Sequence, residues 1–206
     1  MTRIVAGTAG GRRIAVPPRG TRPTSERVRE ALFSALEAML DLDGARVLDL
    51  YAGSGALGLE ALSRGAGHAL FVEAERRAAD LLRRNAADLR LRGAEVRTGS
   101  VATVLMETPA LPYDVVFADP PYALGEAELR EVLGRLVERR WLAPGAVLLV
   151  ERSVRSADPE WPEPLTALRS RRYGDTAVHW AEYLGPDADT AGAGNTDAGG
   201  ADAGRR

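Results

Sequence analysis

The sequence predicts an α/β protein built on one mostly parallel β-sheet with helices on both faces. Between residues 46 and 150, short runs rich in Val, Leu and Ala alternate with longer segments of helical periodicity, as strand–helix–strand units do. A glycine-rich turn follows the first of these strands, and two final strand-like segments are joined by Gly174-Asp175. The 206 residues suit a single core. We therefore expect a parallel sheet with an antiparallel C-terminal hairpin, preceded by a small N-terminal β-hairpin and a helix.

The first forty residues predict that hairpin and helix. Residues 3–6 and 13–16 flank a glycine-rich centre and are typical of two short strands. Residues 25–40 repeat apolar side chains at helical spacing. Thr24 or Ser25 can cap the first turn of this helix, and Pro23 keeps the residue before it out of helical angles.

The rest of the chain divides into alternating elements. Strands are expected at residues 47–50, 68–72, 95–98, 113–118 and 146–150, and helices at 57–64, 76–92 and 126–139. Segments 167–173 and 177–183 form the closing hairpin. After Gly185 the composition cannot bury an apolar core. We therefore expect a basic N-terminal extension (1–40), a main domain that carries the catalytic site (41–184) and a disordered tail (185–206).

Composition excludes several classes of protein. The chain has no cysteine and only two histidines, so we expect no disulfide and no metal site. It has no apolar run long enough for a membrane span and no signal region at its start, so we expect a cytoplasmic protein. Residues 1–25 hold five arginines and no acid, although the net charge is −2. Such a segment can contact phosphates or can be an ordinary solvated surface, and Arg12 and Arg13 are candidates for the first role.

The glycine-rich turn predicts a nucleotide-like cofactor. Its residues Ala52, Gly53, Ser54, Gly55 and Gly58 follow a strand and open a helix, where glycines let the backbone turn tightly and approach a ligand. Glu73, at the end of the next strand, can accept both hydroxyls of a ribose. These features suit a dinucleotide as well as S-adenosylmethionine. Asp49 favours the second, because an acid before the turn repels a pyrophosphate and attracts a sulfonium or an ammonium group.

A third cofactor contact would follow the third strand. The sequence there reads Thr98-Gly-Ser-Val101. Ser100 can donate a hydrogen bond to or accept one from an adenine, although more weakly than a carboxylate would.

The tetrapeptide Asp119-Pro120-Pro121-Tyr122 predicts a site for a flat ring with an exocyclic amine. The carboxylate of Asp119 and the carbonyl of Pro120 can each accept one amine N–H, while the two prolines hold the backbone and add no donor. Tyr122 offers a face on which the ring can stack. Positioning of the amine next to a methyl donor would then supply most of the rate acceleration. In isolation the same residues could form a stiffened loop with Asp119 as a helix cap.

The order of these motifs resembles the class I S-adenosylmethionine-dependent methyltransferases, whose core is a Rossmann-like sheet. Within that class the chain is similar to the bacterial 16S rRNA guanine-N2 methyltransferases, which act on a single guanine of the small ribosomal subunit. The carrying segments are residues 3–7, 11–13, 21–24, 27–33, 48–66, 119–122 and 173–176.

The resemblance implies roles for the candidate residues. Glu73 would bind the cofactor ribose, and Asp49 with the 53–58 turn its methionine end. Asp119 and Tyr122 would hold the guanine, and Arg22 and Thr24 would lie near the mouth of the site. The implied substrate is 16S rRNA in an assembled or partly assembled 30S subunit, methylated by a monomer.

Four alternatives remain open. A DNA adenine-N6 methyltransferase uses the same tetrapeptide but normally needs a recognition domain to flip the base from a duplex. A protein glutamine methyltransferase normally has Asn where this chain has Asp119. A nicotinamide-dependent oxidoreductase would share the glycine turn and Glu73, and a non-catalytic RNA-binding module would share the fold alone. Glu151 ends a strand near the expected cleft without an assigned role.

Overall fold

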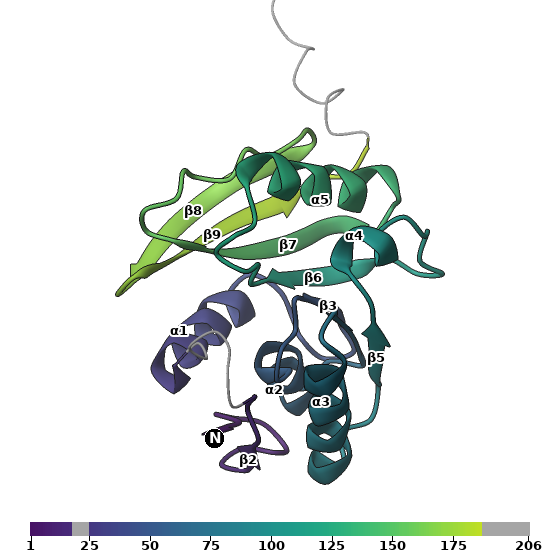
Figure 1. The fold of residues 1–206 in the computed structure, drawn as a ribbon, viewed down its shortest axis with the longest axis vertical. Helices are drawn as coiled ribbons and strands as arrows, with labels where there is room; N and C mark the ends of the chain where they lie inside the picture. Colours follow the sequence, from purple (N-terminus) through teal and green to yellow (C-terminus); the bar gives the residue numbers. More distant parts are fainter. Residues whose placement is uncertain (18–24, 187–206) are drawn as a thin grey trace, which may run out of the picture.

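The computed structural model describes residues 1–17 and 25–186, and within them a seven-stranded sheet has the order β5-β4-β3-β6-β7-β9-β8 (Figure 1). Its strands are β3 (Arg46–Leu50), β4 (His68–Glu73), β5 (Ala94–Thr98), β6 (Tyr113–Ala118), β7 (Leu142–Ser153), β8 (Leu165–Tyr173) and β9 (Thr176–Tyr183). The five strands from β5 to β7 are parallel, and β9 pairs antiparallel with both β7 and β8. The predicted fold class is therefore confirmed, including the antiparallel C-terminal edge.

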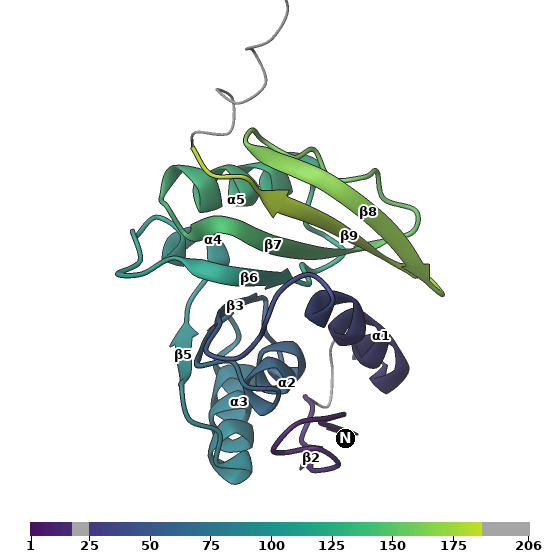
Figure 2. The same ribbon diagram turned by 180° about the vertical axis from the view of Figure 1, so that it is seen from behind.

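Five helices cover the two faces of the described sheet. They are α1 (Glu26–Glu37), α2 (Ala56–Ser63), α3 (Arg76–Leu89), α4 (Val101–Val104) and α5 (Glu126–Glu138). One buried cluster joins α1, α2 and α3 to one face, and a second joins α4 and α5 to the other. Figures 1 and 2 show these two helical layers from opposite sides. None of the helices in the described ranges has the length and apolarity needed to cross a bilayer.

Several element ends differ from the sequence prediction by up to four residues; helix α3, for example, ends at Leu89 instead of residue 92. Helix α1 ends three residues before Leu40, and β7 begins four residues before Ala146. The short helix α4 was not predicted. Its four residues are too few to show helical periodicity, and only the side-chain cap at Ser100 marks its start.

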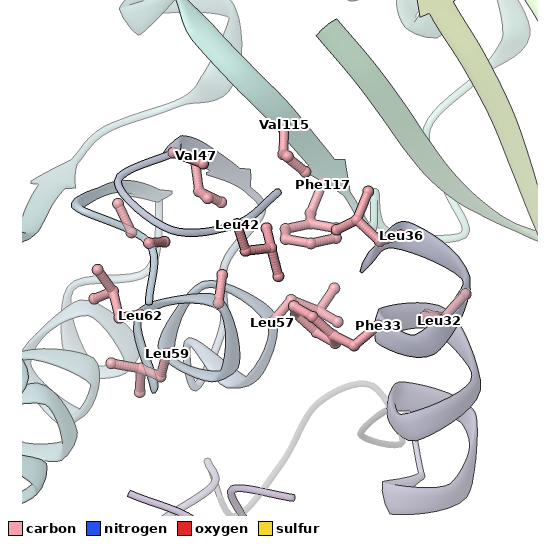
Figure 3. Close-up of a cluster of buried hydrophobic side chains, with 14 of the residues drawn as sticks. Leu32, Phe33, Leu36, Leu42, Val47, Leu57, Leu59, Leu62, Val115 and Phe117 are labelled. Atoms are coloured by element: carbon pink, nitrogen blue, oxygen red, sulfur yellow. The ribbon is translucent and has the colours of Figure 1, made fainter. Parts of the chain in front are cut away.

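The N-terminal helix shares the main core. Phe33 of α1 lies with its ring centroid 5.6 Å from that of Phe117 in β6, and Leu32 and Leu36 are buried in the same cluster (Figure 3). Because one core spans both sides of residue 40, the described residues of this N-terminal segment, 1–17 and 25–40, pack as part of the main body. The domain boundary at that position stays a prediction.

The N-terminal hairpin, β1 (Thr2–Arg3) with β2 (Arg13–Ile14), is fixed against α2. The buried carboxylate of Glu60 accepts hydrogen bonds from the backbone N–H groups of Val5 and Ala6 at 2.7 and 2.9 Å. A Cβ on Gly7 would lie 1.8 Å from the carbonyl oxygen of Ser63. Only glycine allows this approach, so the segment is docked closely on α2.

Candidate active site

Four acids line the carboxyl edge of the parallel strands, where open α/β sheets bind their ligands. Asp49 lies in β3, Glu73 ends β4, Asp119 follows β6, and Glu151 lies near the end of β7. Strand register places Val72, Leu50, Ala118 and Val150 at one level across β4, β3, β6 and β7. Glu73, Asp119 and Glu151 therefore follow at one level, with Asp49 just below it. We call these four residues the acid row.

The glycine turn has the strand–turn–helix geometry that the sequence predicts. Tyr51, Gly53 and Gly55 have positive φ angles of 60°, 54° and 79°, and α2 begins directly after Gly55. The N–H of Gly58 donates to Asp49 Oδ2 at 2.9 Å, and a Cβ at Gly58 would lie 2.3 Å from Cε1 of Phe71. The turn therefore depends on glycine both for its backbone angles and for its packing.

Glu73 is held next to this turn. Its Oε2 accepts from the N–H of Gly53 at 2.7 Å, and its Oε1 accepts from the N–H of Glu75 at 2.7 Å. Each carboxylate oxygen keeps a second lone pair for a ligand hydroxyl. The geometry suits the expected ribose contact, and that role stays a prediction.

Asp49 differs from the charged acid assumed in the sequence argument. The side chain is buried, and burial raises its pKa to about 8, an effect that the hydrogen bond from Gly58 partly offsets and that Asp119, Glu73 and Glu151 increase. Its carboxyl is therefore largely protonated at neutral pH. A nearby cation would favour the ionised form.

The Asp119–Tyr122 turn is held in place by hydrogen bonds at its C-terminal end. The N–H of Leu124 donates to the carbonyl of Pro121 at 2.8 Å. Arg152, a residue that the sequence argument missed, donates through Nη2 to the carbonyl of Leu124 at 3.1 Å and to the carboxylate of Glu126 at 2.6 Å. Its guanidinium thereby fastens the end of the turn to the start of α5.

The same turn opens on a pocket. Its lining residues come from the turn, from the end of β7 and the segment that follows it, and from the start of β9: Asp119, Pro120, Tyr122, Glu151, Arg152, Ser153, Ser156 and Thr176. Tyr122 is 72% exposed, so its ring is accessible for stacking. Burial raises the pKa of Asp119 to about 6, and its carboxyl is mostly ionised at neutral pH. Pro121 is exposed and does not line the pocket in the described structure.

Ser100 lies after β5, at the same carboxyl edge. Its Oγ accepts from the N–H of Thr103 at 3.1 Å and lies 2.7 Å from Thr103 Oγ1. The hydroxyl therefore caps α4, and its expected adenine contact stays a prediction.

The arginine candidates lie apart from this edge or outside the described residues. Arg12 donates to the carbonyls of Asp88 and Leu89 at 2.5 and 3.0 Å, at the C-terminal end of α3. Helix α3 has 14 residues and begins just after Glu73, so Arg12 lies about 20 Å from the acid row. Arg13 is exposed on β2. Arg22 and Thr24 fall outside the described residues.

Asn85 is a further residue that sequence reasoning missed. Its amide donates to the carbonyls of Ala15 and Ser54 at 2.9 and 3.0 Å, and its Oδ1 accepts from the N–H of Ala15 at 3.0 Å. One buried side chain thus connects the N-terminal segment to the glycine turn. A lone Asn within a helix gives no local signal of such a role.

The Rossmann-like sheet, with a glycine turn and an Asp-Pro-Pro-Tyr turn on its neighbouring central strands, defines an S-adenosylmethionine-dependent methyltransferase. The chain belongs to the family described as conserved hypothetical protein 95, whose model matches residues 2–182.

Relatives with known names or structures agree with this assignment. The chain is 39% identical over 176 residues to ribosomal RNA small subunit methyltransferase D of Escherichia coli, a match that covers 85% of this chain and 86% of the relative. The protein of the same name from Haemophilus influenzae is 38% identical and covered over 89% of its length, against 84% of this chain. A solved structure of the Escherichia coli protein yhhF, described as a methyltransferase candidate, superimposes with a TM-score of 0.77 at 37% identity and covers 88% of this chain and 97% of its own. The resemblance drawn from the motifs is thus confirmed for the family.

Proposed function

We propose that this chain transfers the methyl group of S-adenosylmethionine to the exocyclic N2 amine of one guanine in 16S rRNA of the small ribosomal subunit. The observation that carries the proposal is the adjacency of two turns on neighbouring strands. The glycine turn follows β3 and the Asp119–Tyr122 turn follows β6, and β3 and β6 pair directly. A cofactor at the first turn and an amine at the second would therefore meet at one edge of the sheet.

The residues at the glycine turn fit the cofactor. Asp49 and the backbone from Ala52 to Gly58 would hold its methionine end, Glu73 its ribose, and Ser100 its adenine. Bound there, S-adenosylmethionine supplies an electrophilic methyl group on a positively charged sulfur. The neighbouring acids suit that charge, because each lies in a partly desolvated position where attraction to a cation is stronger than in water.

The residues at the second turn orient the nucleophile. The carboxylate of Asp119 and the carbonyl of Pro120 accept the two N–H groups of the amine, and the ring of Tyr122 stacks on the base. Methylation forms an N–C bond while the S–C bond breaks, and the amine then carries one proton too many. Asp119, with a pKa of about 6, can accept this proton and release it to solvent through the pocket.

Ribosomal RNA is the substrate that the relatives support. The names of the Escherichia coli and Haemophilus influenzae relatives specify the small ribosomal subunit, and the motifs quoted from the sequence resemble those of guanine-N2 methyltransferases. The described part of the chain has no separate domain for reading duplex DNA, so we infer that a folded ribonucleoprotein surface presents the base. We also propose that a monomer acts, which light scattering of the purified chain would check.

The test is transfer of labelled methyl to three substrates: 30S subunits that lack the modification, naked 16S rRNA, and DNA. Digestion to nucleosides should give N2-methylguanosine from the ribosomal particle. The Asp119→Ala variant should lose at least about 100-fold in rate while it binds the cofactor normally, and Asp88→Ala, exposed near the C-terminal end of α3, should retain full activity. N6-methyladenine from DNA would contradict the proposed substrate, and full activity of Asp119→Ala would contradict the amine-acceptor role.

A further inference from the structure

Glu151 is a second carboxylate beside the residues that hold the amine. It lines the same pocket as Asp119, Pro120 and Tyr122, and it is only 7% exposed. Its backbone is fixed in the interior of the sheet by pairing with Val178 of β9. The proposed reaction needs one acceptor carboxylate for the amine, so this second one has no function in the mechanism above.

Its place relative to Asp119 is set by strand register. Ala118 of β6 pairs with Val150 of β7, so Asp119 and Glu151 are the next residues along two neighbouring parallel strands. Neighbouring strands lie about 4.8 Å apart. The two carboxylates therefore flank one pocket at the same level, one strand apart.

A guanine presents two neighbouring donors on its Watson–Crick edge, the N2 amine and the N1–H. An adenine presents its N6 amine beside an N1 that only accepts. A carboxylate that faces N1 therefore makes a hydrogen bond with guanine, while with adenine it brings two sets of lone pairs together. When the wrong base leaves a polar group of the site without a partner, the loss of binding free energy is larger than that from a missing apolar contact.

We propose that Glu151 accepts the N1–H of the target guanine while Asp119 and Pro120 hold its N2 amine. Glu151 thereby selects a base that has a donor at N1. This inference rests on the proposed function, because it assumes that the pocket receives a guanine. The other polar groups that line the pocket are the hydroxyls of Ser153, Ser156 and Thr176, which are neutral, and Arg152. The guanidinium of Arg152 already donates to Leu124 and Glu126, so the two carboxylates are the charged acceptors that distinguish the bases.

The experiment compares two bases at the target position, so that an effect on recognition of the base can be distinguished from an effect on cofactor binding. Small subunits are reconstituted with 16S rRNA, assembled by ligation, that carries either guanine or 2-aminopurine at the mapped methylation position. 2-Aminopurine keeps the amine at C2 but has no hydrogen on N1. The variant is Glu151→Gln, which preserves size and can turn its amide NH₂ toward an accepting N1. The matched control is Glu182→Gln, in β9 opposite Val147, four residues before Glu151 along β7.

The wild-type protein should methylate the guanine particle about 10- to 100-fold faster than the 2-aminopurine particle, the range expected when a charge-assisted hydrogen bond is lost. Glu151→Gln should be slower on guanine by about tenfold, and its preference for guanine should fall toward one. Loss of the O6 atom in 2-aminopurine affects both proteins equally, so the change in preference reports on N1. Cofactor affinity should be unchanged, and Glu182→Gln should behave as the wild type.

Three results would overturn the inference. A wild-type preference near one would do so without any variant, and so would an equal preference in wild type and Glu151→Gln. A parallel loss of cofactor affinity in Glu151→Gln would assign the carboxylate to the cofactor instead. Absence of transfer to the guanine particle by the wild-type protein would overturn the proposed function itself, which the other two substrates of the first assay would show independently.

Discussion

Gly58→Ala should destabilise the protein although the residue lies inside a helix. A Cβ at this position would lie 2.3 Å from Cε1 and 2.8 Å from Cζ of Phe71, and 3.1 Å from Oδ2 of Asp49. Phe71 is fully buried in β4, so its ring has no space into which to move. Alanine would gain about 1 kcal/mol in helix propensity, whereas the enlarged side chain would cost about 3 kcal/mol, at the upper end for overpacking.

The expected net effect is a loss of about 2 kcal/mol in the free energy of unfolding, which corresponds to a fall of roughly 4–8 °C in Tm for a chain of this size. Relief of the clash should also push the start of α2 away from β4 and so weaken cofactor binding. Gly134→Ala in α5 is the matched control, because the nearest atom to its Cβ, Glu138 Oε1, is 4.0 Å away. That substitution should raise stability by about 0.5–1 kcal/mol.

Urea and thermal unfolding of both variants, with calorimetric titration of the cofactor, measure these effects. Adding Phe71→Leu to Gly58→Ala should cost less than the two single changes together, since the smaller side chain frees the space that the added methyl group needs. If Gly58→Ala were as stabilising as Gly134→Ala, the packing argument for this glycine would be refuted.

Four further predictions concern charged residues. The rate of methyl transfer should fall as the pH drops through about 6, where Asp119 becomes protonated. Because the pKa of Asp119 in the folded protein lies above the ordinary 3.8, the ionised carboxylate destabilises the fold above pH 6. Asp119→Asn should therefore raise Tm above pH 6 and leave Tm unchanged below pH 4. Cofactor binding at pH 7 should release a proton from Asp49, whose pKa of about 8 a cation would lower, as calorimetry in two buffers would show. Arg152→Ala should slow transfer about tenfold with unchanged cofactor affinity, because the Asp119–Tyr122 turn loses the hydrogen bonds that connect its end to α5. Arg152→Lys should recover part of the rate. Arg12→Ala should lower the free energy of unfolding by about 1 kcal/mol, whereas Arg13→Ala should weaken RNA binding and reduce its salt slope by about 1.

Each of these has a contrary outcome. A rate independent of pH between 5 and 7 would remove Asp119 as the titrating acceptor. Equal calorimetric enthalpies in the two buffers would exclude proton release from Asp49. A change in cofactor affinity for Arg152→Ala would show that the substitution acts on the glycine turn and not on the Asp119–Tyr122 turn. A changed salt slope of RNA binding for Arg12→Ala would show that this side chain leaves α3 to contact phosphate.

The sequence predicts the elements well because each has a local cause. Alternating apolar runs specify strands and helices, and every predicted strand and helix within the described residues is present, with ends that differ by a few residues. The order of strands across the sheet has no such local cause, because hydrophobic periodicity does not specify which strands become neighbours. The pairing of β3 with β6 joins residues about seventy positions apart, and it is this pairing that brings the two motifs together.

The residues of the site likewise fall into those that the sequence predicts and those that it does not. The glycine turn and the Asp119–Tyr122 turn are contiguous motifs and are visible in the sequence. Glu60, Asn85 and Arg152 act through contacts with segments 26 to 70 residues away, and no short pattern announces such contacts. The protonation of Asp49 is also hidden, because a sequence shows an acid but not the desolvation that raises its pKa.

The geometry of the glycine turn bears on the two cofactors that the sequence left open. A pyrophosphate binds to backbone N–H groups at the start of a helix, and in this turn two of those groups already donate to the protein's own acids, Gly53 to Glu73 and Gly58 to Asp49. A third, of Gly55, donates to the carbonyl of Ala52. An anion would have to displace these bonds and enter a site bordered by Glu73, Asp119 and Glu151, whereas a sulfonium or ammonium group would be attracted to these acids without disturbing the turn. The carboxyl of Asp49, protonated without a ligand, would ionise in favour of the cation. The arrangement that excludes a dinucleotide is therefore the one that suits a cationic methyl donor.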